Sequence, residues 1–253
     1  MLGEAISPTT FLAIFARTAT VFSFVPIPGL KSPVSVARII LSLAVTLALA
    51  SVSPPIAKST LGSGDFVVLL VSEFCLGLTA GLLLSFFFEV FQFAAQMLSQ
   101  QAGFSYAATI DPTNNTDTGV LLVLSQLLAG LTGLALGLDR QIISILSESF
   151  QVLPPGHFAF TPSLLSSVQK AGATVFQVGP SLAIPSVALF LCIDIILGIL
   201  SRIEQQLQLT TILFPLKTAG SVAVVIVIFS VYPGVMSRLL ETTLAALRQA
   251  FGL

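Results

Sequence analysis

The sequence predicts an all-α membrane protein, and three observations carry this prediction. Of the 253 residues, 55% are hydrophobic and only 8% are charged, whereas about a quarter of the residues are charged in an ordinary soluble domain. The mean hydropathy is +1.02, and apolar segments recur along the whole chain. Because too few polar residues remain to cover a soluble domain of this size, we expect one membrane domain built from apolar helices.

Six apolar segments approach the length of about 20 residues that a helix needs to cross a membrane. The first ends at Pro26 and the second at Pro54, because proline cannot donate the next helical hydrogen bond. In the fifth segment, Pro180 and Pro185 predict a kink. The sequence therefore predicts about six hydrophobic helices, over residues 11–25, 34–52, 66–88, 120–138, 174–200 and 211–232.

The first long connection, over residues 89–119, also contains structural signals. Gln92, Gln96 and Gln100 recur at helical spacing, so we expect the third helix to continue to Gly103. The stretch that follows, SYAATIDPTNNTDTG at 105–119, contains Asp, Asn, Pro and Gly, residues typical of an irregular loop.

The second long connection, over residues 139–173, predicts a further short helix. The stretch ISILSESFQVLPPG has helical character until Pro154, Pro155 and Gly156 end it. Thr161 and Pro162 then resemble an N-cap and a first-turn proline, which predicts that the next helix begins there.

Several charged residues lie inside or beside the apolar segments, where an ionised group costs about 2.5 to 3.5 kcal/mol at the centre of a bilayer. One interpretation is an ion pair between Arg17 and either Glu73 or Asp194, which would fix how the helices align. A second is a proton or ion relay, and a third is that these segments do not lie in lipid. Two further cations, Arg202 and Lys217, belong to the same group of intramembrane polar or charged candidates.

Small and polar residues form stripes along three of the predicted helices. Small side chains let helix backbones approach closely, so tight packing is the first interpretation and direct solute binding is the alternative. Stripes on several helices also suit a subunit that packs against other subunits. The three stripes are Glu73, Gly77 and Gly81; Gln126, Gly130, Gly133 and Gly137; and Asp194, Gly198 and Ser201.

The composition argues against several classes of function. The 10 Lys and Arg residues are scattered singly in a chain of net charge −1, so no basic patch for nucleic acid is present. The single histidine, His157, has no second histidine or nearby cysteine, and Cys75 and Cys192 are far apart in sequence. We therefore expect no catalytic residues, no metal site and no cofactor.

Two stretches of the sequence resemble the FliR family of flagellar biosynthesis proteins and its SctT-type counterparts in type III secretion injectisomes. The family pattern is G-Q-x(4)-Q-x-G-[LF]-S-x-A, then a D-P loop, and later S-F-x-x-x-P. The matching residues here are Gln96, Gln101, Gly103, Phe104, Ser105, Ala107, Asp111, Pro112, Ser149, Phe150 and Pro154. Segments around Arg17 and Pro26 and around Pro215, Lys217 and Gly220 are also similar to the family.

The sequence departs from the family pattern at a few positions. The first motif glycine is Ala95, and the usual Gly-His after the fourth helix is Leu138 and Asp139. In the later R-x-x-P-Q-L-N motif, Gln205 replaces the proline and Gln208 the asparagine. These changes put in doubt the helix break after Arg202.

The resemblance implies a non-enzymatic subunit of a protein export gate in the bacterial inner membrane, within a flagellar or injectisome basal body. Its implied partners are FliP-like and FliQ-like subunits, other export apparatus proteins and unfolded protein substrates in transit. It also implies long, kinked helical hairpins packed in a helical assembly, with a FliP-like part at about 1–175 and a FliQ-like hairpin at about 176–253.

The resemblance further implies that the loop after the G-F-S motif plugs the closed channel. The implied plug residues are Phe104, Ser105, Tyr106, Ile110, Asp111, Pro112, Asn114 and Asn115. Gln92, Gln96 and Gln101 would line the entrance or pack between helices. The alternative function is a small-solute or ion-coupled transporter that uses Arg17, Glu73 and Asp194 at a midplane site, and an intramembrane enzyme ranks third.

Overall fold

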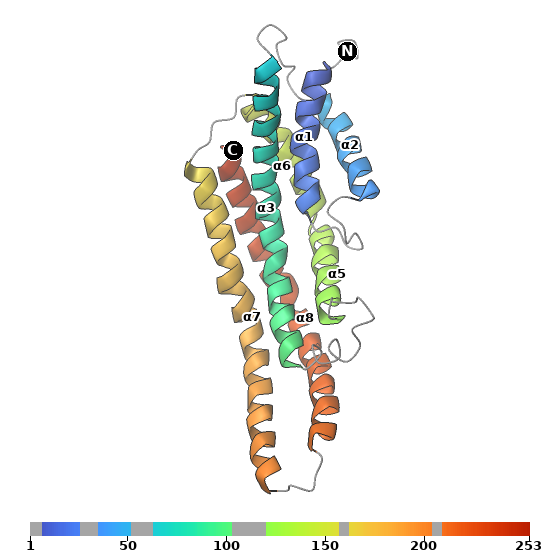
Figure 1. Ribbon diagram of the computed structural model, residues 1–253, viewed down its shortest axis with the longest axis vertical. Coiled ribbons are helices and arrows are strands. Elements are labelled where there is room, and N and C mark those ends of the chain that lie inside the picture. The colour runs from blue at the N-terminus through green and yellow to red at the C-terminus, as the bar shows by residue number, and fades with distance from the viewer. Residues whose placement is uncertain (1–6, 26–34, 52–62, 103–119, 157–161, 204–208) are drawn as a thin grey trace. The chain divides into compact units, whose positions relative to one another are not determined.

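The computed structural model describes residues 7–25, 35–51, 63–102, 120–156, 162–203 and 209–253 (Figure 1). Every regular element in these ranges is an α-helix, as the sequence predicts. The helices are α1 (Pro8–Phe24), α2 (Val36–Ala50), α3 (Ser63–Gln101), α5 (Val120–Ala135), α6 (Leu138–Val152), α7 (Pro162–Ile203) and α8 (Leu209–Phe251).

The described helices differ in whether they suit a membrane crossing. Two are long and apolar enough to cross, α3 over Phe66–Gln101 and α7 over Leu164–Leu200. A third crossing arises if α5 and α6, which meet at a break, count as one broken span, whereas α2 is apolar but shorter. The expectation of about six hydrophobic helices is therefore not confirmed in the described residues, although an all-helical, apolar chain is.

Local sequence signals explain where the first helices begin and end. Ser7 caps α1 by accepting a hydrogen bond from the Thr10 backbone N–H at 3.3 Å, and Ser35 caps α2 in the same way from Arg38. Between α5 and α6, Gly137 has a φ of 74°, a left-handed conformation that glycine adopts without strain. This glycine is what breaks the helix there.

The long helices extend further than their apolar segments. The predicted continuation of the third helix is confirmed, since α3 runs to Gln101. Helix α7 begins at Pro162, as predicted, and passes Pro180 and Pro185 without ending, so it includes the whole 174–200 segment. The predicted short helix before Pro154 is α6.

Helix α8 is the element whose extent the sequence underestimates most. It continues from Leu209 through Pro233 to Phe251, well past residue 232. After Tyr232 the chain has no long apolar run, and its large buried residues are three or four positions apart, namely Met236, Leu240, Leu244, Leu247 and Phe251. A search for continuous apolar runs misses such an amphipathic stretch.

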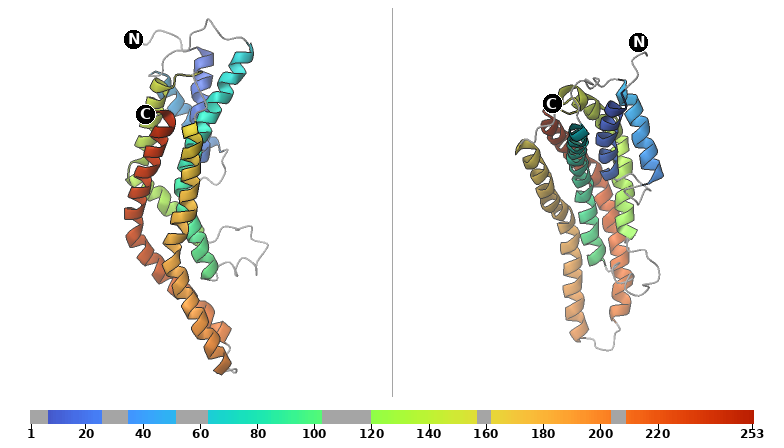
Figure 2. Two further views of the ribbon diagram at one scale, coloured as in Figure 1. Left: turned by 90° about the vertical axis from the view of Figure 1, so that its left-hand side faces the viewer. Right: turned by 45° about the horizontal axis from the view of Figure 1, so that its top comes forward.

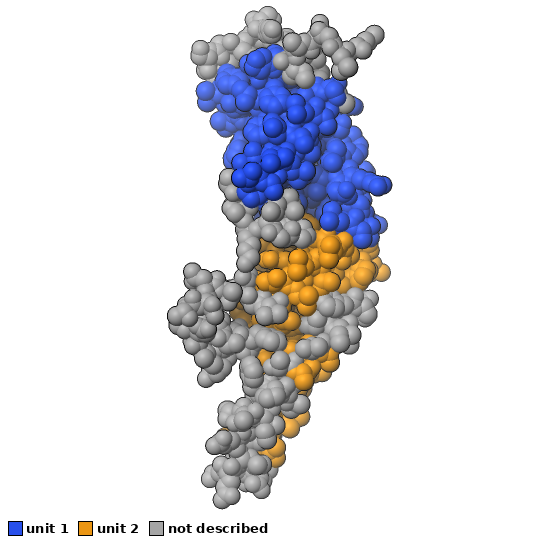
Figure 3. Space-filling view, turned by 90° about the vertical axis from the view of Figure 1, so that its right-hand side faces the viewer, with its two compact units in different colours: residues 1–87, 133–173, 239–253 blue, residues 88–132, 174–238 orange. Residues whose placement is uncertain are grey.

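The chain forms two compact units, coloured separately in Figure 3. Unit 1 comprises residues 1–87, 133–173 and 239–253, and unit 2 comprises 88–132 and 174–238. In unit 1, α1 and α2 lie side by side, as Figure 1 and the right-hand view of Figure 2 show. In unit 2, α3, α5 and α7 supply a small apolar core of Leu98, Ala102, Leu121 and Phe190.

Candidate functional site

A buried ion pair lies at the centre of the polar contacts in unit 1. The Arg17 Nε donates to Glu73 Oε2 at 2.7 Å, which joins α1 to α3. Both side chains are 0% exposed. Of the two partners that the sequence left open for Arg17, the structure therefore pairs it with Glu73.

The same ion pair holds the turn that follows α6. Arg17 donates from Nη1 to Ser149 Oγ and from Nη2 to the Leu153 carbonyl, both at 3.1 Å. Glu73 accepts through its other oxygen from the Gly156 backbone N–H at 3.2 Å. The Leu153–Gly156 turn is thus bonded at one end by the cation and at the other by the anion.

An aromatic ring completes the surroundings of the guanidinium. The Arg17 Cζ lies 4.2 Å from the centroid of the Phe150 ring, a cation–π distance, and Phe150 is itself 1% exposed. The motif residues Arg17, Ser149, Phe150 and Pro154, which are dispersed in sequence, therefore belong to one cluster. We call Arg17, Glu73, Ser149, Phe150 and the Leu153–Gly156 turn the polar cluster.

Two glycines let α1 approach α3 closely enough to form the polar cluster. A Cβ added to Gly77 would lie 2.5 Å from the Arg17 carbonyl oxygen, and one added to Gly81 would lie 2.8 Å from the Phe24 Cβ. Cβ atoms in proteins essentially never lie this close to another atom, so a larger residue at either position would force the helices to shift. The stripe of Glu73, Gly77 and Gly81 is therefore a packing surface for α1, the first of the two interpretations above.

Arg38 is a buried cation of unit 1 that the sequence analysis did not single out. Its Nη1 donates to the carbonyls of Phe22 at 2.8 Å and Ser23 at 2.6 Å, which are among the last carbonyls of α1. These carbonyls have no partner within their own helix, and a cation is favourable at a helix C-terminus. The sequence did contain a signal for this contact. Arg38 lies in the first turn of α2, directly after a connection that contains prolines.

In unit 2, neutral side chains join α3, α5 and α8. Gln126 Nε2 donates to Gln92 Oε1 at 2.9 Å, and Ser125 Oγ donates to the Phe91 carbonyl at 3.2 Å. The Tyr232 hydroxyl donates to the Ser125 carbonyl at 3.4 Å, and its ring lies 4.5 Å from that of Phe91. The candidate Gln92 is thus hydrogen-bonded between α3 and α5.

The remaining candidate side chains differ in their surroundings. Asp194 Oδ1 lies 2.5 Å from Lys217 Nζ, so this pair joins α7 to α8 within unit 2. Gln96 is exposed and Gln101 half-buried. Arg202 is exposed in the last turn of α7, a favourable position for a cation.

The predicted plug residues lie outside the described residues. This holds for all eight of them, which are Phe104, Ser105, Tyr106, Ile110, Asp111, Pro112, Asn114 and Asn115. In the described ranges, no group of three or more His, Cys, Asp or Glu side chains comes together in a way that would hold a metal ion.

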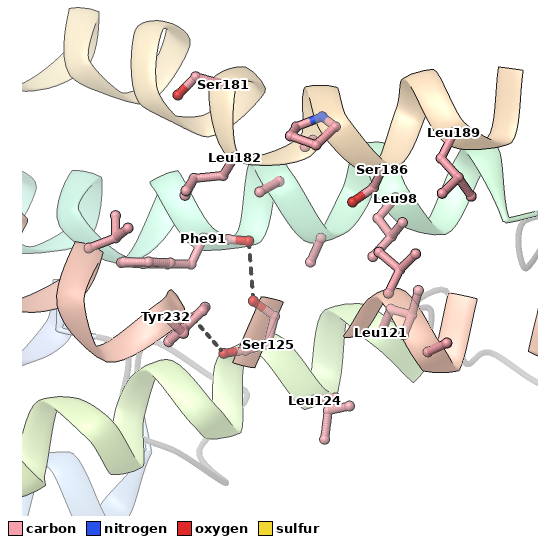
Figure 4. A pocket seen from close by; sticks show the side chains of 17 residues that line it. Phe91, Leu98, Leu121, Leu124, Ser125, Ser181, Leu182, Ser186, Leu189 and Tyr232 are labelled. Carbon is pink, nitrogen blue, oxygen red and sulfur yellow. Dashed lines mark hydrogen bonds between the residues drawn. The ribbon is translucent and has the colours of Figure 1, made fainter. Parts of the chain in front are cut away.

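Unit 2 also contains an apolar cavity of about 570 Å³, shown in Figure 4. Its lining comes from α3, α5, α7 and α8, and includes Phe91, Leu98, Leu121, Leu189 and Tyr232. The sequence analysis did not predict this cavity, because its walls come from segments up to 144 residues apart, from Phe91 to Val235.

Comparison with known proteins places the chain in a family. The model of the family described as bacterial export proteins, family 1, matches residues 9–243. The chain belongs to this family. The match includes every residue of the polar cluster and every residue that lines the cavity.

Curated members of this export family are similar over most of their length. The flagellar biosynthetic protein FliR of Escherichia coli K12 is 29% identical over 200 residues, which is 79% of this chain and 76% of the relative. The surface presentation of antigens protein SpaR of Salmonella typhimurium is 28% identical over 223 residues, 85% of this chain and 81% of the relative. The FliR protein of Bacillus subtilis is 26% identical over 248 residues, 96% and 95% of the two chains. The resemblance to the FliR family is confirmed.

Proposed function

We propose that this chain is a membrane subunit of a flagellar or type III protein export apparatus. With FliP-like and FliQ-like subunits it would form the channel through which unfolded substrates cross the bacterial inner membrane. The observation that carries this proposal is the family match over residues 9–243, together with relatives whose names include both flagellar and secretion proteins.

The polar contacts support a structural subunit more than a carrier of small solutes. The transporter alternative assigns Arg17 and Glu73 to a solute site, but their bonds go to each other and to the turn after α6. Asp194 is likewise engaged, by Lys217. A group that already has protein partners must give them up before it binds a solute, which costs free energy.

The exposed apolar surface of α7 supports assembly with other subunits or lipid. Only 17% of the apolar stretch of α7 is buried inside the chain, against 44% for that of α3. Exposed large side chains on α7 include Ile184, Leu191, Ile195, Ile196 and Ile199. Apolar surface of this extent is removed from water in a native protein, either by a partner or by lipid.

We further propose the division into a FliP-like part at about 1–175 and a FliQ-like hairpin at about 176–253. The Asp194–Lys217 pair supports a hairpin, because it joins α7 and α8 directly. Expressed with FliP-like subunits but without residues 176–253, the chain should no longer recruit the FliQ-like subunit, and undiminished recruitment would contradict the division.

The export proposal is tested by isolating the complex. When the chain is expressed with FliP-like and FliQ-like subunits of the same bacterium, we expect one stable detergent-solubilised complex that contains all three. Deletion of the gene should abolish export of flagellar or effector substrates into the medium. Recovery of the chain only as a monomer, or transport of a small solute by the purified chain in liposomes, would contradict the proposal.

We also propose that the loop after the G-F-S motif closes the channel. Its support is the resemblance to the family and the loop-forming composition of residues 105–119. Deletion of residues 106–117 should raise the ion conductance of membranes that contain the assembled complex. An unchanged conductance, with the complex still assembled, would contradict this role.

A further inference from the structure

The apolar cavity of unit 2 has the dimensions of a ligand site. Its volume of about 570 Å³ lies within the range of about 300 to 1,000 Å³ typical of small-molecule pockets. Its walls come from Ala94, Ala95 and Leu98 of α3, from Leu121 and Leu124 of α5, and from α7 and α8, as Figure 4 shows in part.

The chemistry of the lining selects a hydrocarbon ligand. Of the 17 lining residues, the only ones with polar side chains are Ser125, Ser181, Ser186 and Tyr232, and none of the 17 is charged. Ser125, Ser181 and Tyr232 donate to the carbonyls of Phe91, Val178 and Ser125. Three of the four polar side chains of the lining are thus engaged. A lining with no charge and one further hydroxyl, that of Ser186, favours an apolar ligand over a sugar, an ion or a peptide backbone.

The cavity adjoins surface that suits a membrane interior. Two of its lining residues, Leu124 and Leu189, are 36% and 47% exposed, so its wall continues onto the outside of unit 2. Beyond Leu189, the exposed face of α7 carries Leu191, Ile195 and Ile196. Both α3 and α7 are long and apolar enough to cross a membrane, and the molecules that bathe such a surface are lipids.

An apolar space of this size is unfavourable when nothing fills it. Atoms that line a void lose their dispersion contacts, and water gains too few hydrogen bonds in an apolar cavity to replace them. A flexible hydrocarbon chain regains these contacts without requiring a polar partner.

We propose that the cavity holds an acyl chain of a membrane phospholipid, inserted among α3, α5, α7 and α8. The head group stays outside, at the exposed edge of the cavity. This role goes beyond protein export, because it makes a lipid a constituent of the folded subunit.

The test uses the full-length chain, purified from bacterial membranes with the proteins that co-purify with it. The probe is a phosphatidylethanolamine that carries a photoreactive diazirine near the end of one acyl chain. After illumination, mass spectrometry identifies the labelled residues. We expect labelling on the α3 and α5 walls, between Phe91 and Leu98 and between Leu121 and Ser125.

Matched variants separate the cavity from the general lipid-facing surface. Ala95→Phe places a large side chain in the cavity, and Ala94→Phe repeats the test from a neighbouring wall position. Ala188→Phe makes the same change at an exposed position of α7 that does not line the cavity. Size-exclusion elution and helical circular dichroism establish that each variant is folded.

We expect the label on the cavity walls to be lost in folded Ala95→Phe or Ala94→Phe protein and retained in Ala188→Phe. Labelling of the exposed Ile195 and Ile196 face should remain in all three. The proposal is overturned if the walls are never labelled, or if their labelling survives both cavity-filling substitutions.

Discussion

The two compact units of this chain differ in what lies in their interiors. Unit 1 closes around a fully buried ion pair, Arg17 with Glu73, whose further bonds hold the turn after α6. Unit 2 joins α3 to α5 through the neutral side chains of Gln92 and Gln126, and its ion pair, Asp194 with Lys217, is partly exposed. It also leaves an apolar cavity of about 570 Å³. The interior of unit 1 is therefore filled by contacts within the chain, whereas that of unit 2 leaves room for the acyl chain that we propose.

This difference matters for a subunit of a membrane assembly. A buried charge is strongly destabilising once its partner is removed, so the polar cluster specifies one arrangement of α1, α3 and the turn after α6. The neutral contacts of unit 2 are individually weaker, which leaves its helices open to stabilisation by lipid or by other subunits. Substitutions in each unit measure this contrast.

The largest effect is expected from Glu73→Ala. This substitution leaves the buried Arg17 without its counter-ion and the Gly156 N–H without its acceptor. Breaking a buried ion pair in this way costs about 3 to 5 kcal/mol. We expect a much lower midpoint of thermal unfolding in detergent, followed by circular dichroism.

The matched control is Glu89→Ala, which removes an exposed carboxylate from the same helix. It should change the unfolding midpoint little, since the side chain only accepts a weak hydrogen bond of 3.4 Å from Gln92. If both substitutions lowered the unfolding midpoint equally, the polar cluster would have no special role in the stability of unit 1.

An intermediate effect is expected from Gly77→Ala. The added Cβ would lie 2.5 Å from the Arg17 carbonyl oxygen, so α1 and α3 must move apart. Overpacking of this kind costs about 1 to 3 kcal/mol. The unfolding midpoint should fall, and the yield of folded protein with it.

Gly198→Ala makes the same change on α7 with nothing within 4 Å of the new Cβ. Because alanine favours a helix interior by about 0.5 to 1 kcal/mol over glycine, this variant should be as stable as the parent or more so. A Gly77→Ala protein as stable as Gly198→Ala would show that α1 does not lie against α3 as described.

The smallest effect is expected in unit 2, from Gln126→Ala. It removes the donor to Gln92 Oε1, and one such hydrogen bond contributes about 0.5 to 1.5 kcal/mol. Gln96→Ala, at an exposed position of α3, controls for the loss of a glutamine. If Gln126→Ala destabilised the protein as much as Glu73→Ala, the contrast between the two units would be wrong.

Much of the fold was predictable because its signals are local. Prolines predicted where α1, α2 and α6 end, and apolar runs predicted the central parts of α3 and α7. The end of α8 was missed because its large buried residues, from Met236 to Phe251, recur every three or four positions and form no continuous apolar run. An amphipathic helix in an otherwise apolar chain is recognised by apolar residues three or four positions apart, and not by an apolar run.

The polar cluster was predictable in part. Arg17 and Glu73 were conspicuous as charges within apolar segments, and a pairing of Arg17 with Glu73 or Asp194 was one interpretation. The contacts to Ser149, Leu153 and Gly156 were not predictable, because they span up to 136 residues of sequence. The cavity could not be predicted for the same reason, because its walls come from four helices that are far apart in sequence.

The most direct test of the structural role of the polar cluster is the export of a secreted substrate by single and double variants. The strains would lack their own copy of the gene and carry Arg17→Met, Glu73→Leu or both. A buried ion pair can often be replaced by apolar side chains of similar size without loss of stability, whereas either charge left alone is costly.

We therefore predict that each single variant secretes little substrate and that the double variant secretes clearly more than either. Immunoblots of the membrane fraction should show the same order in the amount of the chain. A double variant that exports no better than the worse single variant, although equally abundant in the membrane, would mean that the charges act in transport itself and would contradict the structural role.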